Sequence, residues 1–203
     1  MPSELSSKIQ ESVELRRTNY TLSKASPISD ERILEIVQHA TRHVPSSFNS
    51  QSNRAVVLLN ANHTKLWDIT TEVLKAIVPA ENFPATEARL NGFANSYGTV
   101  LFFEDETDVK AMQTSFPLYQ DRFPIWSQHS SGMLQYVIWT QFAAEGLGAN
   151  LQHYNPLIDE RVRAEWNIPA TWQLVAQMPF GTPTAPAGEK TFKPIEDLVK
   201  LHK

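Results

Sequence analysis

The stretch that decides the fold is Met133-Leu-Gln-Tyr-Val-Ile-Trp-Thr-Gln-Phe-Ala-Ala-Glu-Gly-Leu-Gly-Ala-Asn-Leu-Gln-His153. Its apolar side chains cover more than one helical face, so residues 130–145 predict a helix in the centre of the molecule. Gly146 and Gly148 end this helix, and residues 149–153 predict a short strand directly after it. The apolar run is interrupted by Gln and Thr and is too short to cross a bilayer.

Further elements are predicted on both sides of this stretch. Apolar residues at spacings of three and four predict helices over residues 3–16, 29–40, 64–78 and 157–165. Short apolar runs predict strands at residues 55–59, 99–103 and 172–178. Because these elements lack a regular β-α-β alternation, the sequence predicts an α+β fold.

Two segments do not fit this pattern. Residues 104–128 are acidic, interrupted by proline and rich in aromatic side chains, which is more typical of a lid than of a regular element. The residues from about Gly181 are rich in Pro and Gly and predict an extended C-terminal arm. We therefore expect residues 1–203 to form a single domain that ends in this arm.

Composition narrows the possible functional classes. Of the 203 residues, 41% are hydrophobic and 20% are charged, which is ordinary for a globular protein. A net charge of −4 with scattered basic residues argues against a nucleic-acid binder. Because the chain has no cysteine, any redox chemistry must come from a bound cofactor. The first residues lack the basic and apolar regions of a signal peptide, so we expect a cytoplasmic protein that does not contact membranes.

Two polar segments in the first half could carry chemistry. Arg16-Arg-Thr18 offers two guanidinium groups and a hydroxyl at a helix end, a pattern that suits phosphate oxygens but also an ordinary solvated helix end. The loop Pro45-Ser-Ser-Phe-Asn-Ser-Gln-Ser-Asn-Arg54 concentrates hydroxyl and carboxamide groups. Such a loop could hydrogen-bond the carbonyl and N–H groups at the edge of a flavin ring, or it could be a polar turn.

Two more segments lie in the second half. The glycines of Glu145-Gly-Leu-Gly-Ala-Asn-Leu-Gln-His-Tyr154 would let the backbone approach a flat ligand, although a helix C-cap has the same pattern. This segment follows a helix and lacks the third glycine of a dinucleotide fingerprint. Lys190, in the arm, could contact a phosphate or remain solvated.

Other kinds of site are not supported by the sequence. His39 and His43 have helical spacing, but no glutamate lies between them, so we predict no metal site. The chain has neither a Gly-x-Ser-x-Gly motif nor a Walker-type loop. The acidic run Glu104-Asp-Glu-Thr-Asp108 predicts a solvated loop rather than a catalytic pair.

Taken in order, these segments resemble the nitroreductase family. The shared order is an N-terminal Arg-Arg-Thr, a Pro-Ser-Ser-x-Asn-Ser-Gln loop some 30 residues later, a helix ending in Gly-Leu-Gly, and a late Lys before a Pro. The stretches Tyr97–Asp105 and Gly146–Pro156 are similar to its fungal-type branch, which also has bacterial members. The resemblance covers about residues 15–198. It implies an α+β homodimer with a central mixed or antiparallel sheet, flanking helices, and two FMN sites that each use both subunits.

The resemblance also implies which residues bind FMN. The residues expected near the phosphate and ring from one subunit are Arg16, Arg17, Thr18, Tyr20 and Lys190. The residues expected from the other subunit are Pro45, Ser46, Ser47, Asn49 and Gln51. The residues expected along the ring edge near the flavin N5 atom are Leu151, Gln152 and His153.

Three positions depart from the family pattern. The family usually has a basic residue beside flavin N1 and O2, two positions after the Ser or Thr of the first motif, and Tyr20 stands there in this chain. Arg54, Arg17 or a neutral donor could take over its role in stabilising a reduced, anionic flavin. Phe192 stands where a second basic residue often follows the late lysine, and His153 replaces an acidic residue often found near N5.

The implied activity is a two-step, ping-pong redox reaction. NADH or NADPH would deliver hydride to FMN, and a small nitroaromatic or quinone-like acceptor would then take the electrons. The flavin carries the chemistry, so no catalytic side chain is predicted. The lack of a dinucleotide fingerprint agrees with this, because the nicotinamide ring needs only to stack on an exposed flavin face.

A group of aromatic residues could form the apolar roof of the acceptor pocket. These residues are Phe116, Tyr119, Phe123 and Trp126, and packing in the protein core would explain them equally well. Two alternative functions stay open at this point: a flavin-binding sensor with little turnover, and a flavin enzyme of the same fold with different chemistry.

Overall fold

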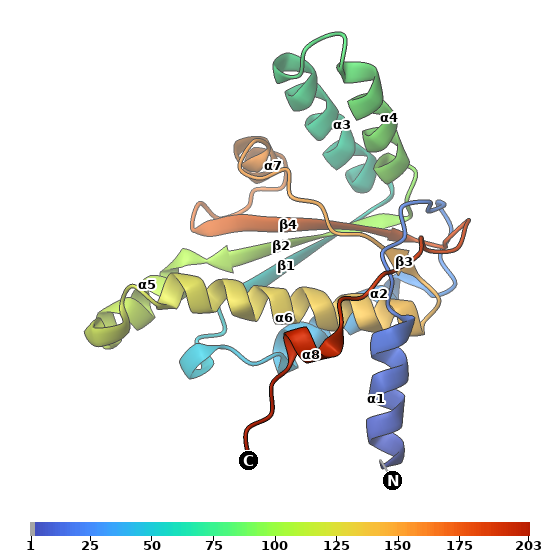
Figure 1. The fold of residues 1–203 in the computed structure, drawn as a ribbon. Coiled ribbons are helices and arrows are strands. Elements are labelled where there is room, and N and C mark those ends of the chain that lie inside the picture. Colours follow the sequence, from blue (N-terminus) through green and yellow to red (C-terminus); the bar gives the residue numbers. More distant parts are fainter. Residues whose placement is uncertain (1–2) are drawn as a thin grey trace.

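A four-stranded antiparallel sheet forms the middle of the molecule. The computed structural model describes residues 3–203. The strands are β1 (Asn53–Leu59), β2 (Gly98–Asp105), β3 (Gly148–Ala149) and β4 (Trp172–Gly181), and they lie side by side in the order β1-β2-β4-β3 (Figure 1). Every pair of neighbouring strands is antiparallel. The α+β fold with a central sheet is therefore confirmed.

Helices cover both faces of this sheet. Helices α2 (Asp30–His43) and α6 (Phe123–Ala144) lie on one face, and α3 (Asn60–Ile77), α4 (Phe83–Ala94) and α7 (Asp159–Glu165) lie on the other (Figure 1). Strand β2 shows why two cores form, because successive side chains on a strand point to opposite faces. Val100 and Phe102 belong to the core beside α2 and α6, whereas Leu101 and Phe103 belong to the core beside α3, α4 and α7.

Helix α6 is the predicted central helix, and it begins at Phe123 rather than at residue 130. Pro124 stands in its first turn, where a missing N–H removes no hydrogen bond. Leu134, Ile138 and Phe142 are completely buried against the sheet. On another face, Met133 and Tyr136 are each 40% exposed, so the described chain does not bury all the apolar side chains of this helix.

The prediction of a lid over residues 104–128 is wrong. The segment contains the last residues of β2, helix α5 (Glu106–Ser115), a 3-10 turn at Pro117–Tyr119 and the start of α6. The side chain of Asp105 accepts a hydrogen bond from the Thr107 N–H at 3.0 Å and so caps α5. The acidic residues that suggested a loop are the cap and first turn of a helix.

Most other helices follow the predictions, with one omission. Helices α1 (Glu4–Leu15), α2 and α7 lie where they are predicted, and α3 begins at Asn60 rather than at residue 64. Helix α4 was not predicted. Its apolar residues are too evenly spread to show a clear face, and the informative signal is Pro84 in the first turn.

Strand β3 is shorter than predicted, because residues 150–153 do not continue it as a regular strand. The pairing with β4 runs through Ala149 opposite Phe180, which places Asn150 opposite Pro179. Asn150 donates its N–H to the Pro179 carbonyl at 3.2 Å, but proline has no N–H to return the bond. Pairing resumes as an isolated bridge between Gln152 and Gln177.

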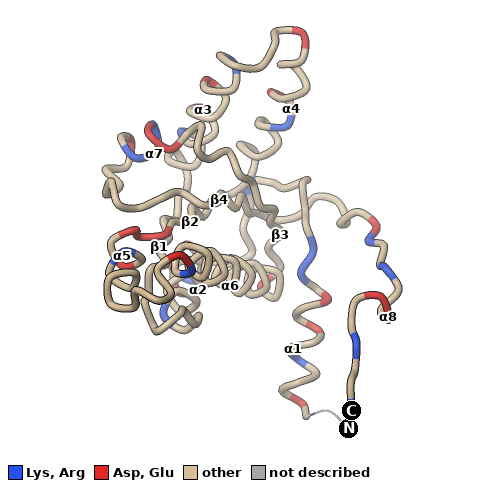
Figure 2. The backbone as a smooth tube through the Cα atoms, turned by 60° about the vertical axis from the view of Figure 1, so that its left-hand side comes forward, with Lys and Arg blue, Asp and Glu red and all other residues tan. Residues whose placement is uncertain are grey.

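The first helix and the last residues extend from the sheet and helix layers. Helix α1 has no buried residue, and the arm after β4 is largely exposed and contains the short helix α8 (Ile195–Leu198). Both ends of the described chain lie on the side of the sheet that α6 covers (Figures 1 and 2). Within residues 3–203, none of the helices combines the length and apolar character needed to span a membrane.

Candidate functional site

Two segments far apart in sequence lie side by side at one edge of the sheet. Thr18 forms a parallel bridge with Ala149, and the Asn19 N–H donates to the Ala149 carbonyl at 3.0 Å. The Asn150 side chain donates back to the Asn19 carbonyl at 2.8 Å. The predicted residues of the Arg16–Tyr20 and Leu151–His153 segments are thereby brought together.

Arg16 is held by aromatic rings at the junction of α1 and α6. Its guanidinium carbon lies 4.7 Å from the Trp139 ring centre and 5.9 Å from that of Tyr136. Its Nε atom is buried and has no hydrogen-bond partner within residues 3–203. No carboxylate in the described chain forms a salt bridge with Arg16, so its charge is available to an anionic ligand.

Arg17 connects the same region to the C-terminal arm. Its guanidinium group donates a hydrogen bond to the Gly188 carbonyl, two residues before Lys190. The Lys190 ammonium lies 5.0 Å from the ring centre of Phe192 and is exposed. The beginning of the arm is fixed to the segment after Tyr20, because Thr184 N–H donates to the Thr21 carbonyl at 2.9 Å.

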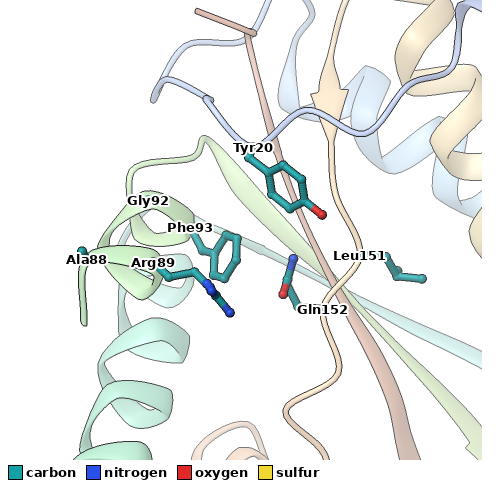
Figure 3. A pocket seen from close by; sticks show the side chains of 7 residues that line it. All are labelled: Tyr20, Ala88, Arg89, Gly92, Phe93, Leu151 and Gln152. Carbon is teal, nitrogen blue, oxygen red and sulfur yellow. The ribbon is translucent and has the colours of Figure 1, made fainter. Parts of the chain in front are cut away.

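A pocket of about 610 Å³ opens beside these segments (Figure 3). Its lining residues are Tyr20, Ala88, Arg89, Gly92, Phe93, Leu151 and Gln152. Three of them are predicted site residues, and the other four come from the unpredicted helix α4. The volume lies in the range of small-molecule sites, which is roughly 300–1,000 Å³. His153, predicted with its neighbours, is exposed and does not line this pocket.

Helix α4 presents Arg89 and Gly92 to the pocket from a firmly packed base. Leu90 is completely buried, and Phe93 lies 5.0 Å from the ring centre of Trp67. Burial raises the pKa of Tyr154 behind Phe93, and the positive charge of Arg89 opposes that shift. The sequence did not identify Arg89, because the helix that carries it was not predicted.

The predicted polar loop lies in a separate place and has a strained backbone. Phe48, Asn49 and Gln51 have positive φ angles of 54°, 55° and 50°. Ser46 stabilises the turn, since its hydroxyl accepts from the Gln51 N–H at 2.9 Å. Positive φ is uncommon for residues other than glycine and is often found at binding sites. Pro45 and Asn49 are exposed, and Ser47 is partly exposed.

The four predicted aromatic residues gather around this loop. Phe48 packs against Phe116, Phe123 and Trp126, with ring centres 4.5, 5.6 and 6.3 Å away. Tyr119 completes the group at 5.9 Å from Trp126 and is 47% exposed. Phe123 is buried, so at least one member of the group is part of the core.

The two halves of the predicted site lie at opposite ends of α6. Arg16 contacts Trp139, whereas Phe48 contacts Trp126, 13 positions earlier in the same helix. At about 1.5 Å per residue these positions are roughly 20 Å apart. Figure 1 shows α1 at one end of α6 and α5 at the other. A single chain therefore does not bring Arg16 and Asn49 together.

A cluster of charged residues lies near the loop, where β1 and β2 pair. Arg54 forms salt bridges with Asp105 at 3.1 Å and with Asp108 at 2.7 Å. Glu104 is 2% exposed, and burial raises its pKa to about 7 even though Ser52 donates a hydrogen bond to it. The acidic run is therefore partly buried and paired, and the prediction that it forms a solvated loop is wrong.

Within residues 3–203, no three His, Asp or Glu side chains are grouped as metal ligands. Figure 2 shows Lys and Arg spread among Asp and Glu along the chain rather than gathered on one element.

Comparisons with known proteins agree on one family. The model of the nitroreductase family matches residues 13–182. The Saccharomyces cerevisiae protein HBN1 is 39% identical over 179 residues, which cover 87% of this chain and 89% of the relative. The nitroreductase FRM2 of the same yeast is 35% identical over 189 residues, which cover 92% and 93% of the two chains.

Solved structures give the same result. Nitroreductase CinD from Lactococcus lactis, in complex with chloramphenicol, is 45% identical with a TM-score of 0.87, and the match covers 96% of this chain and 100% of CinD. CinD in complex with 4-nitrophenol matches equally well. A Desulfovibrio desulfuricans protein in complex with FMN shares the fold, with a TM-score of 0.70 at 15% identity.

Proposed function

Since this chain belongs to the nitroreductase family, we propose that it is an FMN-dependent oxidoreductase that acts as a homodimer. It takes hydride from NADH or NADPH and passes electrons to nitroaromatic or quinone-like acceptors in a two-step, ping-pong reaction. The observation that carries this proposal is the match to CinD over 96% of the chain, because chloramphenicol and 4-nitrophenol, its ligands, both contain an aromatic nitro group.

The residues at the edge of the sheet fit a flat cofactor with a phosphate group. Arg16 has a buried Nε atom without a partner in the described chain, and neither Arg16 nor Lys190 forms a salt bridge there. Arg16, Arg17, Thr18 and Lys190 would hold the phosphate, since guanidinium and ammonium groups form strong charge-assisted bonds to phosphate oxygens. When bound, FMN would supply the hydride chemistry at its N5 atom.

The ring of the cofactor would lie over the pocket at Tyr20, Leu151 and Gln152, with His153 at its edge. Gln152 is well positioned for this, because its backbone pairs with Gln177 at 2.7 and 2.9 Å and its side chain donates to Asn150 at 2.7 Å. These bonds fix the segment before any ligand binds. A fixed polar edge orients the ring without a large entropic cost.

The second half of each site would come from the partner subunit. Pro45, Ser46, Ser47, Asn49 and Gln51 form one strained loop. Since Phe48 of this loop packs on Phe116, Phe123 and Trp126, the aromatic group would enter the site together with the loop. Its apolar rings, with Tyr119, would exclude water and stack on the nitroaromatic or nicotinamide ring.

A visible absorption spectrum of the purified protein tests the cofactor, and steady-state oxidation of NADH and NADPH with 4-nitrophenol or a quinone tests turnover. We expect bound FMN and parallel double-reciprocal plots, as a ping-pong reaction requires. Bound FMN without turnover would instead support a sensor role. Absence of FMN under saturating conditions would refute the proposal.

A further inference from the structure

Tyr20 leaves the ring end of the proposed FMN site without the charge that a basic residue would bring. Of the seven residues that line the pocket, Arg89 is the only charged one. No carboxylate lines the pocket, and the other polar side chains, those of Tyr20 and Gln152, can both donate hydrogen bonds. The pocket therefore has a positive end, on the side that helix α4 supplies (Figure 3).

The two other arginines that could replace a basic residue at position 20 are engaged elsewhere. Arg54 forms salt bridges with both Asp105 and Asp108, so its charge is neutralised. Arg17 donates to the Gly188 carbonyl in the arm. Arg89 forms no salt bridge with any residue of the described chain.

The sequence of α4 explains why Arg89 lies on the side of the helix that lines the pocket. Arg89, Gly92 and Phe93 have the i, i+3 and i+4 spacing that places residues on one side of a helix. A Cβ atom added at Gly92 would meet no atom within 4 Å, so this side of the helix faces open space. Phe93 anchors this side of the helix between Trp67 and Tyr154, at ring-centre distances of 5.0 and 6.5 Å.

We propose that Arg89 stabilises the negative charge of reduced, anionic FMN, in place of the basic residue that this chain lacks at position 20. The inference rests on the proposed function, because it places the flavin ring over this pocket. A cation within about 4–6 Å stabilises a negative charge, and it does so far less for a neutral ring. Arg89 therefore strengthens the binding of reduced FMN more than that of oxidised FMN.

The test compares wild type with Arg89→Gln and Arg89→Lys. Binding of oxidised FMN is measured by fluorescence titration of the apoprotein, and the midpoint potential of bound FMN by reductive titration. We expect Arg89→Gln to bind reduced FMN at least tenfold less well relative to oxidised FMN, which lowers the two-electron midpoint potential by about 30 mV or more. Arg89→Lys keeps most of the wild-type potential, since it keeps the charge.

A rescue variant shows whether the change in midpoint potential comes from the lost charge or from a structural change. In the Arg89→Gln background, Tyr20→Lys returns a positive charge to the same pocket from a different segment of its wall, and we expect it to restore the potential. Lys75→Gln is the matched control. It removes one positive charge from the neighbouring helix α3, outside the pocket, and the potential stays unchanged.

The absorbance of the reduced protein gives a second readout. As the pH is lowered, the anionic reduced flavin gains its proton at a higher pH in Arg89→Gln than in wild type. A folded Arg89→Gln protein with the wild-type potential and the same reduced spectrum overturns the inference while leaving the proposed function intact. A wild-type protein that binds no FMN overturns both.

Discussion

Arg16 is fixed by aromatic rings and not by a carboxylate, and this has consequences for ligand binding. Its guanidinium group lies over Trp139 and beside Tyr136, so the side chain is already ordered, and no carboxylate of the described chain pairs with it. An ordered, uncompensated cation binds a phosphate without first breaking an internal salt bridge.

We therefore expect Arg16→Ala to weaken FMN binding by about 1.5–3 kcal/mol, because charge-assisted phosphate contacts are lost. Titration of the apoprotein with FMN measures this change, with Arg42→Ala as a control for loss of an exposed arginine on α2. Circular dichroism checks that α1 is intact. If Arg16→Ala and Lys190→Ala both bind FMN as wild type does, the phosphate lies elsewhere.

Glu104 makes folding stability depend on pH in a defined direction. Burial raises its pKa from 4.5 to about 7, so the folded chain holds a proton that the unfolded chain releases over this range. The stability that the neutral carboxyl contributes is present below pH 4.5 and is lost as the pH rises through 7. His63 changes the folding stability in the opposite direction. Burial lowers its pKa from 6.5 to about 4, so the stability that the neutral ring contributes is lost as the pH falls from 6.5 toward 4.

The substitution Glu104→Gln isolates the contribution of Glu104 to the pH dependence of stability. Gln keeps an oxygen for the Ser52 hydroxyl but cannot ionise. The difference in unfolding free energy between variant and wild type should grow between pH 4.5 and 7 and then stay constant, reaching no more than about 3 kcal/mol. Urea unfolding across this range measures it. A difference that does not vary with pH would mean that Glu104 is ionised in the folded protein.

The sequence predicts where most helices and strands lie better than it predicts whether a polar segment is a loop or a helix. The apolar periodicity of α2 and α6 and the short apolar runs of β1, β2 and β4 could be recognised because burial against one sheet demands these patterns. The lid prediction failed because Asp105 and the acidic residues after it suit both a loop and a helix start, and only the cap geometry distinguishes them.

The sequence identifies only some residues of the candidate site. The segments at Arg16, Pro45, Leu151 and Lys190 could be singled out because their residue types carry charge or hydrogen-bonding groups. Arg89 could not, since its place in the pocket comes from the packing of α4 beside Tyr20. The shortening of β3 also depends on a tertiary relationship, namely Pro179 lying opposite Asn150.

Strand β4 ends at Gly181, where the chain passes so close to two other backbone segments that an added Cβ atom would clash. A methyl group at Gly181 would overlap the Ser23 carbonyl oxygen and lie 3.0 Å from the Tyr97 nitrogen. Both are backbone atoms that cannot turn aside. We expect Gly181→Ala to destabilise the protein by about 1–3 kcal/mol, the usual cost of overpacking. Chemical denaturation measures this, and Gly188→Ala, with nothing within 4 Å, is the matched control. Equal stability of the two variants would show that the crossing can relax.

Apolar surface remains uncovered on one side of the protein. Met133 and Tyr136 on α6, Ile9 and Val13 on α1, and Ile195 and Leu198 in the arm are each at least 40% exposed. All three elements lie on the side of the sheet that α6 covers (Figure 1). An extended apolar surface of this kind is typical of an obligate homodimer interface.

We expect sedimentation at low micromolar concentration to give about twice the chain mass, and Met133→Asp to shift the protein toward monomer. A charge buried in an apolar interface is costly when it has no partner. Ile77→Asp is the control, because Ile77 is 56% exposed on α3, on the opposite face of the sheet. A clean wild-type monomer that retains its FMN would refute both the dimer and a shared site.

The distance between the halves of the site leads to a last prediction. Arg16 contacts α6 at Trp139, whereas Phe48, next to Asn49, contacts it at Trp126, roughly 20 Å away along the helix. A complete site would therefore take Arg16 from one subunit and Asn49 from its partner. Asn49→Leu should leave a folded protein that binds FMN about 1–3 kcal/mol less tightly, since Leu cannot donate to or accept from the ring edge. If Asn49 only shapes its turn, stability will fall while FMN affinity per folded protein stays the same.

Mixed dimers then determine which chains share a site. In a heterodimer of an Arg16→Ala chain and an Asn49→Leu chain, one site would carry both defects and the other would carry neither. Such a heterodimer, purified with two different tags, should recover about half of the wild-type activity, whereas each homodimeric variant has two defective sites. If instead both residues served the flavin from one chain, each site of the heterodimer would carry one defect and activity would stay at the level of the single variants. Half-site recovery therefore requires that the partner supplies Asn49, because one chain holds Arg16 and the Asn49 loop at different ends of α6.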